Sequence, residues 1–127
     1  MGESKAPGIC KTVLLVEDDE AIRQVLQMML EVEQFDVLVA ANGQEALEIL
    51  AKAPVRPCLI LLDLMMPVMN GWEFVEAVNK VEAYASIPIV VITAFHDKVD
   101  TIKVNGFMLK PIEFDGFLKT VRQYCGT

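Results

Sequence analysis

A run of five apolar residues, 58–62, lies near the middle of the chain and ends at the carboxylate of Asp63. Without polar alternation, such a run is typical of a strand covered on both faces, as in the interior of a parallel sheet. The residues that follow are expected to form a loop, because Pro67 disfavours helical geometry in the residue before it and Asn70-Gly71 is a turn dipeptide. Asp63 is therefore predicted at the carboxyl end of a strand, where it does not cap an immediate helix.

The rest of the chain alternates between strand-like apolar runs and helix-like apolar stripes. Apolar residues at positions 22, 25, 26, 29 and 30 have the spacing of one helix face. Asn42 with Glu45 resembles a capping box that opens the next helix. Strands that alternate with helices predict βαβ units, a parallel sheet and a three-layer α/β sandwich. The predicted strands are 11–16, 35–40, 58–63, 87–92 and 107–109, and the predicted helices cover 22–30, 42–50, 72–81 and 114–124.

Composition narrows the class of protein. With 127 residues and 54% hydrophobic residues the chain is expected to form one domain, residues 11–127, after a flexible leader, residues 1–10. A net charge of −7 argues against direct nucleic acid binding, which requires a basic face. No apolar stretch approaches the ~18 residues of a membrane span, and no signal peptide is evident. Three cysteines without paired spacing argue against a disulfide framework, so we expect a cytoplasmic protein.

Acidic residues follow two of the predicted strands. Glu17 and Asp18 come after the first strand, and Asp63 ends the third. Because the carboxyl ends of parallel strands lie along one edge of a sheet, these side chains can converge there. Three clustered carboxylates repel one another unless a cation lies among them, and oxygen ligands of this kind suit Mg²⁺ or Mn²⁺.

The ends of the fourth and fifth strands supply partners for an anion. Thr93 offers a hydroxyl and Ala94 a backbone N–H at the end of the fourth strand, and Lys110 follows the fifth. A lysine beside carboxylates is expected to lower their pKa and to hold an incoming anion. These groups suit a phosphoryl group arriving on a carboxylate, with Asp63 as the candidate nucleophile that forms an acyl phosphate.

These segments resemble the receiver domain of two-component response regulators. The resemblance covers residues 11–125 and implies a flavodoxin-like fold with sheet order 2-1-3-4-5. It also suggests a stand-alone, chemotaxis-regulator-like protein. It is carried by five signatures in order along the chain, namely Glu17-Asp18, Leu61-Leu62-Asp63, the loop with Met66-Pro67 and Asn70-Gly71, Thr93-Ala94 and Lys110-Pro111.

The resemblance implies a role for each strand-end residue. Asp63 would accept a phosphoryl group from a phosphohistidine on a sensor histidine kinase or a histidine phosphotransfer protein. The phosphoryl oxygens would contact Lys110, Thr93 and Ala94. The Mg²⁺ ligands implied by the resemblance are Glu17, Asp18, Asp63 and the backbone carbonyl of Met65.

The resemblance also implies how the signal leaves the domain. Phe107 occupies the position of the aromatic switch residue and would act together with Thr93 on a downstream effector that the sequence does not name. The Lys110-Pro111 peptide bond is expected to be cis. Considered by itself, however, Phe107 is equally compatible with a plain core aromatic.

Two departures from the family pattern have consequences. The stretch from Thr93 to Lys110 is more than one helical turn shorter than usual, so the fourth helix of the fold is predicted to be shortened or missing. Met65 and Phe95, each two residues after a site residue, are both apolar. We hypothesise that this pair shields the acyl phosphate from water and prolongs its lifetime.

Two other functions compete with the phosphoacceptor. The chain could be a receiver-like interaction module that works without phosphorylation, which the short segment before the fifth strand allows. It could instead be a Mg²⁺-dependent phosphatase with an aspartyl nucleophile. Such enzymes usually carry a second Asp two residues after the nucleophile, and this chain has Met65 there. The sequence therefore favours a protein that promotes its own phosphorylation and dephosphorylation over a turnover enzyme.

Overall fold

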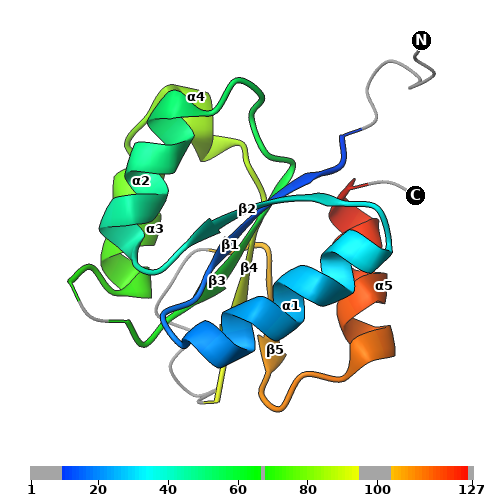
Figure 1. The fold of residues 1–127 in the computed structure, drawn as a ribbon. Helices are drawn as coiled ribbons and strands as arrows, with labels where there is room; N and C mark the ends of the chain where they lie inside the picture. Colours follow the sequence, from blue (N-terminus) through cyan, green and yellow to red (C-terminus); the bar gives the residue numbers. More distant parts are fainter. Residues whose placement is uncertain (1–9, 67, 95–103, 126–127) are drawn as a thin grey trace, which may run out of the picture.

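The computed structural model describes residues 10–66, 68–94 and 104–125 (Figure 1). Strands and helices alternate over most of this length. The strands are β1 (Thr12–Val16), β2 (Asp36–Ala40), β3 (Leu59–Asp63), β4 (Ile89–Thr93) and β5 (Gly106–Leu109). The helices are α1 (Glu20–Val32), α2 (Gly43–Lys52), α3 (Gly71–Asn79), α4 (Glu82–Ala85) and α5 (Phe114–Cys125).

The five strands form one parallel sheet in the order β2-β1-β3-β4-β5, as predicted. The strands β3 and β4, in the interior of the sheet, bury every side chain, which agrees with their unbroken apolar sequences. The register pairs Asp63 with Ile92 and Thr93 with Leu109. The carboxyl ends of three strands therefore lie next to one another at one rim of the sheet.

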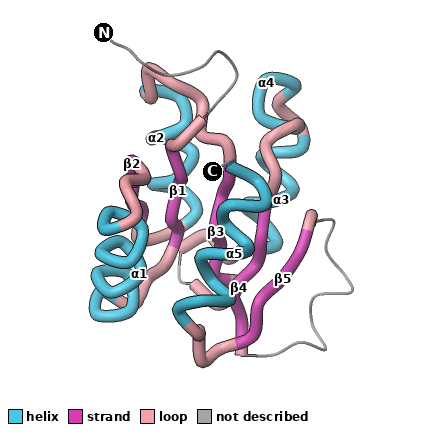
Figure 2. Tube along the Cα trace, turned by 90° about the vertical axis from the view of Figure 1, so that its right-hand side faces the viewer, coloured by secondary structure: helices cyan, strands magenta, loops and turns pink. Residues whose placement is uncertain are grey.

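Helices cover both faces of the sheet, so the molecule has the predicted three layers. The ribbon shows α1 and α5 on one side of the strands and α2, α3 and α4 on the other (Figure 1), and the view turned by 90° shows α5 crossing in front of the sheet (Figure 2). Alternate strand residues divide between two cores. Leu15 and Leu61 pack toward α1 and α5, whereas Leu14 and Ile60 pack toward α2 and α3.

The helix that follows the Asp63 loop has the more complete cap. The Asn70 side chain accepts a hydrogen bond from the N–H of Glu73, and the Glu73 carboxylate accepts one from the N–H of Asn70, which makes a capping box at the start of α3. At α2 the Asn42 side chain caps Glu45 as predicted, but the Glu45 carboxylate accepts from Ala41 instead of Asn42. The predicted box at Asn42 is therefore only half formed.

Two other segments bear on the sequence predictions. The short helix α4 was not predicted, because its four residues carry no apolar stripe and none of them is buried. The fourth helix, predicted to be shortened or missing within residues 96–106, falls mostly on residues 95–103, which lie outside the described part of the chain. Residues 1–9 of the predicted leader lie outside it as well. None of the helices in the described ranges combines the length and the hydrophobicity that spanning a bilayer requires.

Candidate functional site

Three carboxylates gather at the rim where β1 and β3 end. One carboxylate oxygen from each of Glu17, Asp18 and Asp63 lies within 4.8 Å of the other two. Glu17 is 1% exposed and Asp63 is 5% exposed, whereas Asp18 is open to solvent. Glu17 and Asp18 follow β1 directly and Asp63 is the last residue of β3, so the register of the two neighbouring strands brings the group together.

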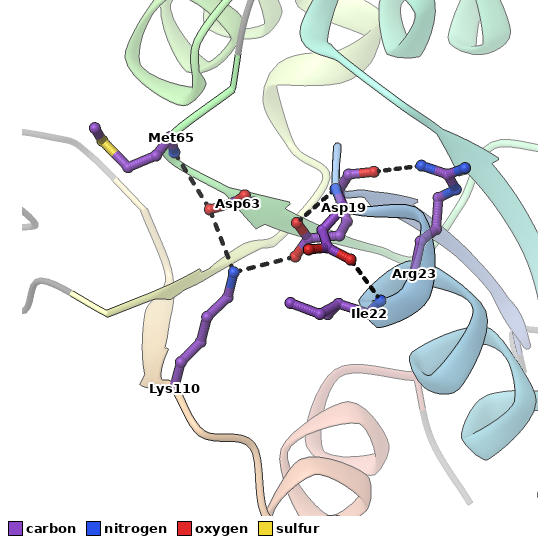
Figure 3. A network of polar contacts seen from close by, with 7 residues as sticks. Asp19, Ile22, Arg23, Asp63, Met65 and Lys110 are labelled. Atoms are coloured by element: carbon purple, nitrogen blue, oxygen red, sulfur yellow. Dashed lines mark hydrogen bonds and ion pairs between the residues drawn. The ribbon is translucent and has the colours of Figure 1, made fainter.

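Lys110 extends its amine into this cluster from the segment after β5. The Nζ atom lies 3.3 Å from Oε1 of Glu17 and 3.8 Å from Oδ1 of Asp63. Figure 3 shows the Lys110 side chain pointing toward Asp63. The Lys110 backbone N–H donates to the carbonyl of Thr93 at 2.9 Å, which anchors the residue to the end of β4. The Lys110-Pro111 peptide bond is cis, as the family resemblance implied.

Glu17 is held in place by the turn into α1. Its Oε2 accepts from the N–H of Asp19 at 3.2 Å, and its carbonyl accepts from the Arg23 guanidinium at 2.9 Å. Its Oε1 is buried and, among the described residues, has the ion pair with Lys110 but no hydrogen bond. A buried carboxylate oxygen without a hydrogen bond is costly unless a cation compensates for it. Lys110 supplies one positive charge to the three carboxylates of this cluster, so the oxygen set and the Oε1 atom without a hydrogen bond fit an additional divalent cation such as Mg²⁺.

The electrostatics of Asp63 differ from the expectation based on Lys110 alone. Burial is the largest influence and, with the repulsion and hydrogen bonding of Glu17, it raises the pKa of Asp63 from 3.8 to about 7. The Lys110 amine and the Met65 N–H, which donates to Oδ1 of Asp63 at 3.2 Å, lower the pKa but do not offset the other influences. Lys110 therefore lowers the pKa of Asp63 as predicted, but burial and Glu17 raise it by more, so the net shift is upward.

The remaining predicted residues lie at or near the same rim. Thr93 is 1% exposed and stands one position beyond the register partner of Asp63, and Ala94 beside it is exposed. The Met65 backbone is hydrogen-bonded to Asp63, but its side chain is 53% exposed. Phe107 lies on β5 opposite Val91 and is 50% exposed, so it is not a buried core aromatic. Phe95, the other half of the predicted shield, lies outside the described residues.

Three residues support the site without being among its predicted ligands. The Asp19 side chain caps α1 by accepting a hydrogen bond from the N–H of Ile22 at 3.0 Å (Figure 3). The N–H of Asp19 donates to the carboxylate of Glu17, and the Arg23 guanidinium donates to the carbonyl of Glu17. Gly71 packs so closely on the residue after Asp63 that a Cβ there would lie 2.7 Å from Cα of Leu64. The acidic turn and the Asn-Gly pair were signals for Asp19 and Gly71, whereas nothing in the sequence pointed to Arg23.

Comparison with known proteins agrees with the geometry. Residues 13–122 match the sequence profile of the response regulator receiver domain. The chain belongs to this family. Among curated relatives it is 29% identical to the polar-differentiation response regulator DivK of Brucella anthropi, over 91% of this chain and 97% of DivK. Among solved structures it is similar to chemotaxis protein CheY4 of Vibrio cholerae, with a TM-score of 0.82, 32% identity and coverage of 91% and 98%.

Other relatives show that the receiver fold occurs in several contexts. The chain is 34% identical to the DNA-binding response regulator MtrA of Mycolicibacterium smegmatis, covering 87% of this chain but only 48% of MtrA. A receiver domain of the sensor histidine kinase PA1611 from Pseudomonas aeruginosa, solved with a magnesium ion in its active site cleft, has a TM-score of 0.84 at 24% identity and therefore supports the fold alone. Receiver domains are generally non-catalytic signalling modules with an acidic Mg²⁺ pocket. The predicted family and sheet order are thus confirmed.

Proposed function

We propose that this receiver domain is a phosphorylation switch in which Asp63 is the phosphoacceptor. The observation that supports it best is the position of the Lys110 amine, between the two buried carboxylates of Glu17 and Asp63. A single ammonium cannot neutralise two or three carboxylates, so the site favours an additional cation. It is then able to accommodate the further negative charge of a phosphoryl group.

The proposed step is transfer from a phosphohistidine on a histidine kinase or a phosphotransfer protein. A carboxylate oxygen of Asp63 attacks phosphorus, the P–N bond breaks with its electron pair going to the imidazole, and an acyl phosphate remains on Asp63. Glu17, Asp18, Asp63 and the Met65 carbonyl would hold Mg²⁺, which would supply charge neutralisation. Lys110, the Thr93 hydroxyl and the Ala94 N–H would bind phosphoryl oxygens at the shared rim of β3, β4 and β5.

The proposed output is a shift between two populations of the domain's surface. Thr93 lies beside Asp63 at the end of β4, and Phe107 lies on the neighbouring strand with half of its surface exposed. A movement of Thr93 toward a phosphoryl oxygen would change the space next to β5, where Phe107 has room to change its exposure. We propose Thr93 and Phe107 as the switch pair on this basis, with a downstream effector as the reader.

The decisive experiment is intact-protein mass spectrometry after treatment with acetyl phosphate, with and without Mg²⁺. We expect the wild type to gain one phosphoryl group per chain in a Mg²⁺-dependent reaction. The variant Asp63→Asn, which lacks the acceptor, should gain none. Asp36→Asn is the matched control, because Asp36 is exposed at the opposite end of a strand, the start of β2. We expect Lys110→Gln to be phosphorylated more slowly than the wild type, because an oxygen-binding cation is lost.

The same experiment separates the competing functions. A wild-type chain that gains no phosphoryl group at any Mg²⁺ concentration would support a phosphorylation-independent interaction module. Continuous release of many phosphate equivalents per chain would support a phosphatase. A stable phosphoryl group that persists in Asp63→Asn would place the acceptor elsewhere and refute the assignment of Asp63.

A further inference from the structure

The three cysteines of the chain meet at the rim of the sheet opposite the phosphoryl site. Cys10 precedes β1, Cys58 precedes β3, and Cys125 is the last residue of α5. Both views show the end of α5 beside the beginnings of β1 and β3 (Figures 1 and 2). The whole of β3 separates Cys58 from Asp63, which is roughly 16 Å at the rise of a strand. This cluster has no part in the proposed phosphoryl chemistry.

Two of these thiols are in direct contact. The Sγ atoms of Cys58 and Cys125 lie 2.7 Å apart. The Cys58 thiol also donates to the carbonyl of Thr12 at 3.2 Å, and the Cys10 thiol lies 4.0 Å from the same carbonyl oxygen. A disulfide has an S–S distance of about 2.05 Å, so the first pair has to approach by only roughly 0.7 Å to bond. The Cys10 thiol also has a side-chain hydrogen bond with Cys58, but it has no contact with Cys125 among the interactions of the described residues.

The two thiols differ in their access to solvent: a reagent can reach Cys58, whereas Cys125 is buried behind it. Cys58 is partly exposed, whereas Cys125 is 2% exposed and belongs to the core between α5 and the sheet. Two thiols that serve only as core packing need no accessible partner. A partly exposed thiol backed by a buried one is the arrangement of an attacking and a resolving cysteine.

We propose that Cys58 and Cys125 form a redox pair that a small-molecule disulfide converts into an intramolecular disulfide, tying the end of α5 to the start of β3. The Cys58 thiolate attacks one sulfur of the reagent and releases the first thiol, which leaves a mixed disulfide on Cys58. Cys125 then loses its proton and attacks Cys58 Sγ, and the second thiol leaves. The two cysteines are oxidised by two electrons, one reagent disulfide is reduced to two thiols, and the two cysteine protons end on those thiols.

The local environment makes this oxidation slow at neutral pH. The hydrogen bond with Cys125, followed by burial, raises the pKa of the Cys58 thiol well above its ordinary value, and burial also raises the pKa of Cys10. Because the thiolate is the attacking species, the rate of disulfide formation should increase about tenfold for each pH unit between roughly pH 7 and 9. The pair would therefore respond to sustained oxidation rather than to a brief pulse.

The test is disulfide mapping of the full chain after equilibration with mixtures of oxidised and reduced glutathione. We expect a product lighter than the reduced chain by two hydrogen atoms, a linked peptide pair containing Cys58 and Cys125, and a Cys10 that still alkylates. Cys10→Ser is the matched control and should give the same linkage. Cys58→Ser should abolish it, as should Cys125→Ala, which avoids burying an unpaired hydroxyl.

The mapping of the wild type decides the question even if a variant folds poorly. A chain that stays reduced, or that carries only glutathione adducts, in the most oxidising mixture would overturn the proposal. A linkage between Cys10 and Cys58 would overturn the assignment of the pair. Asp63→Asn should form the same disulfide, so failure of this inference is distinguishable from failure of the phosphoacceptor proposal.

Discussion

The buried carboxylate of Asp63 should destabilise the folded protein at neutral pH, and removing its charge should therefore stabilise it. Asp63 is 5% exposed and its carboxylate lies within 4.8 Å of Glu17 and Asp18 oxygens. The substitution Asp63→Asn keeps the shape of the side chain and removes the charge. Folding of the variant therefore no longer requires the free energy needed to bury an ionised Asp63 beside two other acids.

The pKa of Asp63 gives the magnitude. It is raised from 3.8 to about 7. At about 1.4 kcal/mol for each tenfold change in proton affinity, this displacement corresponds to about 4 kcal/mol between the two protonation states. The folded state binds the proton more tightly than the unfolded state, so the contribution favours folding fully below about pH 4 and is lost as the pH rises through about 7. Asp63→Asn should thus gain roughly 2 to 4 kcal/mol over the wild type above pH 7.

Urea unfolding monitored by circular dichroism, in EDTA and between roughly pH 5 and 8, would measure this difference. The gain of Asp63→Asn over the wild type should grow with pH and level off once Asp63 is ionised. Asp36→Asn, at an exposed site, should change little across the same range. Added Mg²⁺ should stabilise the wild type more than Asp63→Asn. A wild type as stable as Asp63→Asn at pH 8 without Mg²⁺, or a difference independent of pH, would refute the electrostatic argument.

Two further substitutions test the loop around the site. Gly71→Ala should cost roughly 1 to 3 kcal/mol of stability, because its Cβ would lie 2.7 Å from Cα of Leu64. Gly116→Ala, at an exposed position of α5, should instead be neutral or slightly stabilising. Thermal melts would show whether the two variants differ in this direction. Met65→Asn should speed loss of the phosphoryl group, because it replaces an apolar side chain two residues after Asp63 with one that can bind a water molecule. Time-resolved mass spectrometry would measure the rate of this loss, and an equal or slower rate in the variant would contradict shielding.

Much of the site could be predicted because its residues stand at strand ends. The unbroken apolar run before Asp63 indicated an interior strand of a parallel sheet, and the strands of such a sheet share one rim for their carboxyl ends. The position of Lys110 beside Glu17 and Asp63 follows from that topology. Short-range patterns did less well: the complete capping box formed at Asn70 and not at Asn42, because the direction of a carboxylate depends on the chain path before the helix.

The sequence by itself determined the order of the strands and of the longer helices, the family and the chemical groups available at the rim of the sheet. Only the tertiary structure decided how those groups behave. The pKa of Asp63 rises because burial and Glu17 outweigh Lys110, and that balance depends on depth and distance, which sequence spacing does not contain. The contact between Cys58 and Cys125 has the same origin, since the return of α5 to the start of β3 joins residues that are 67 positions apart.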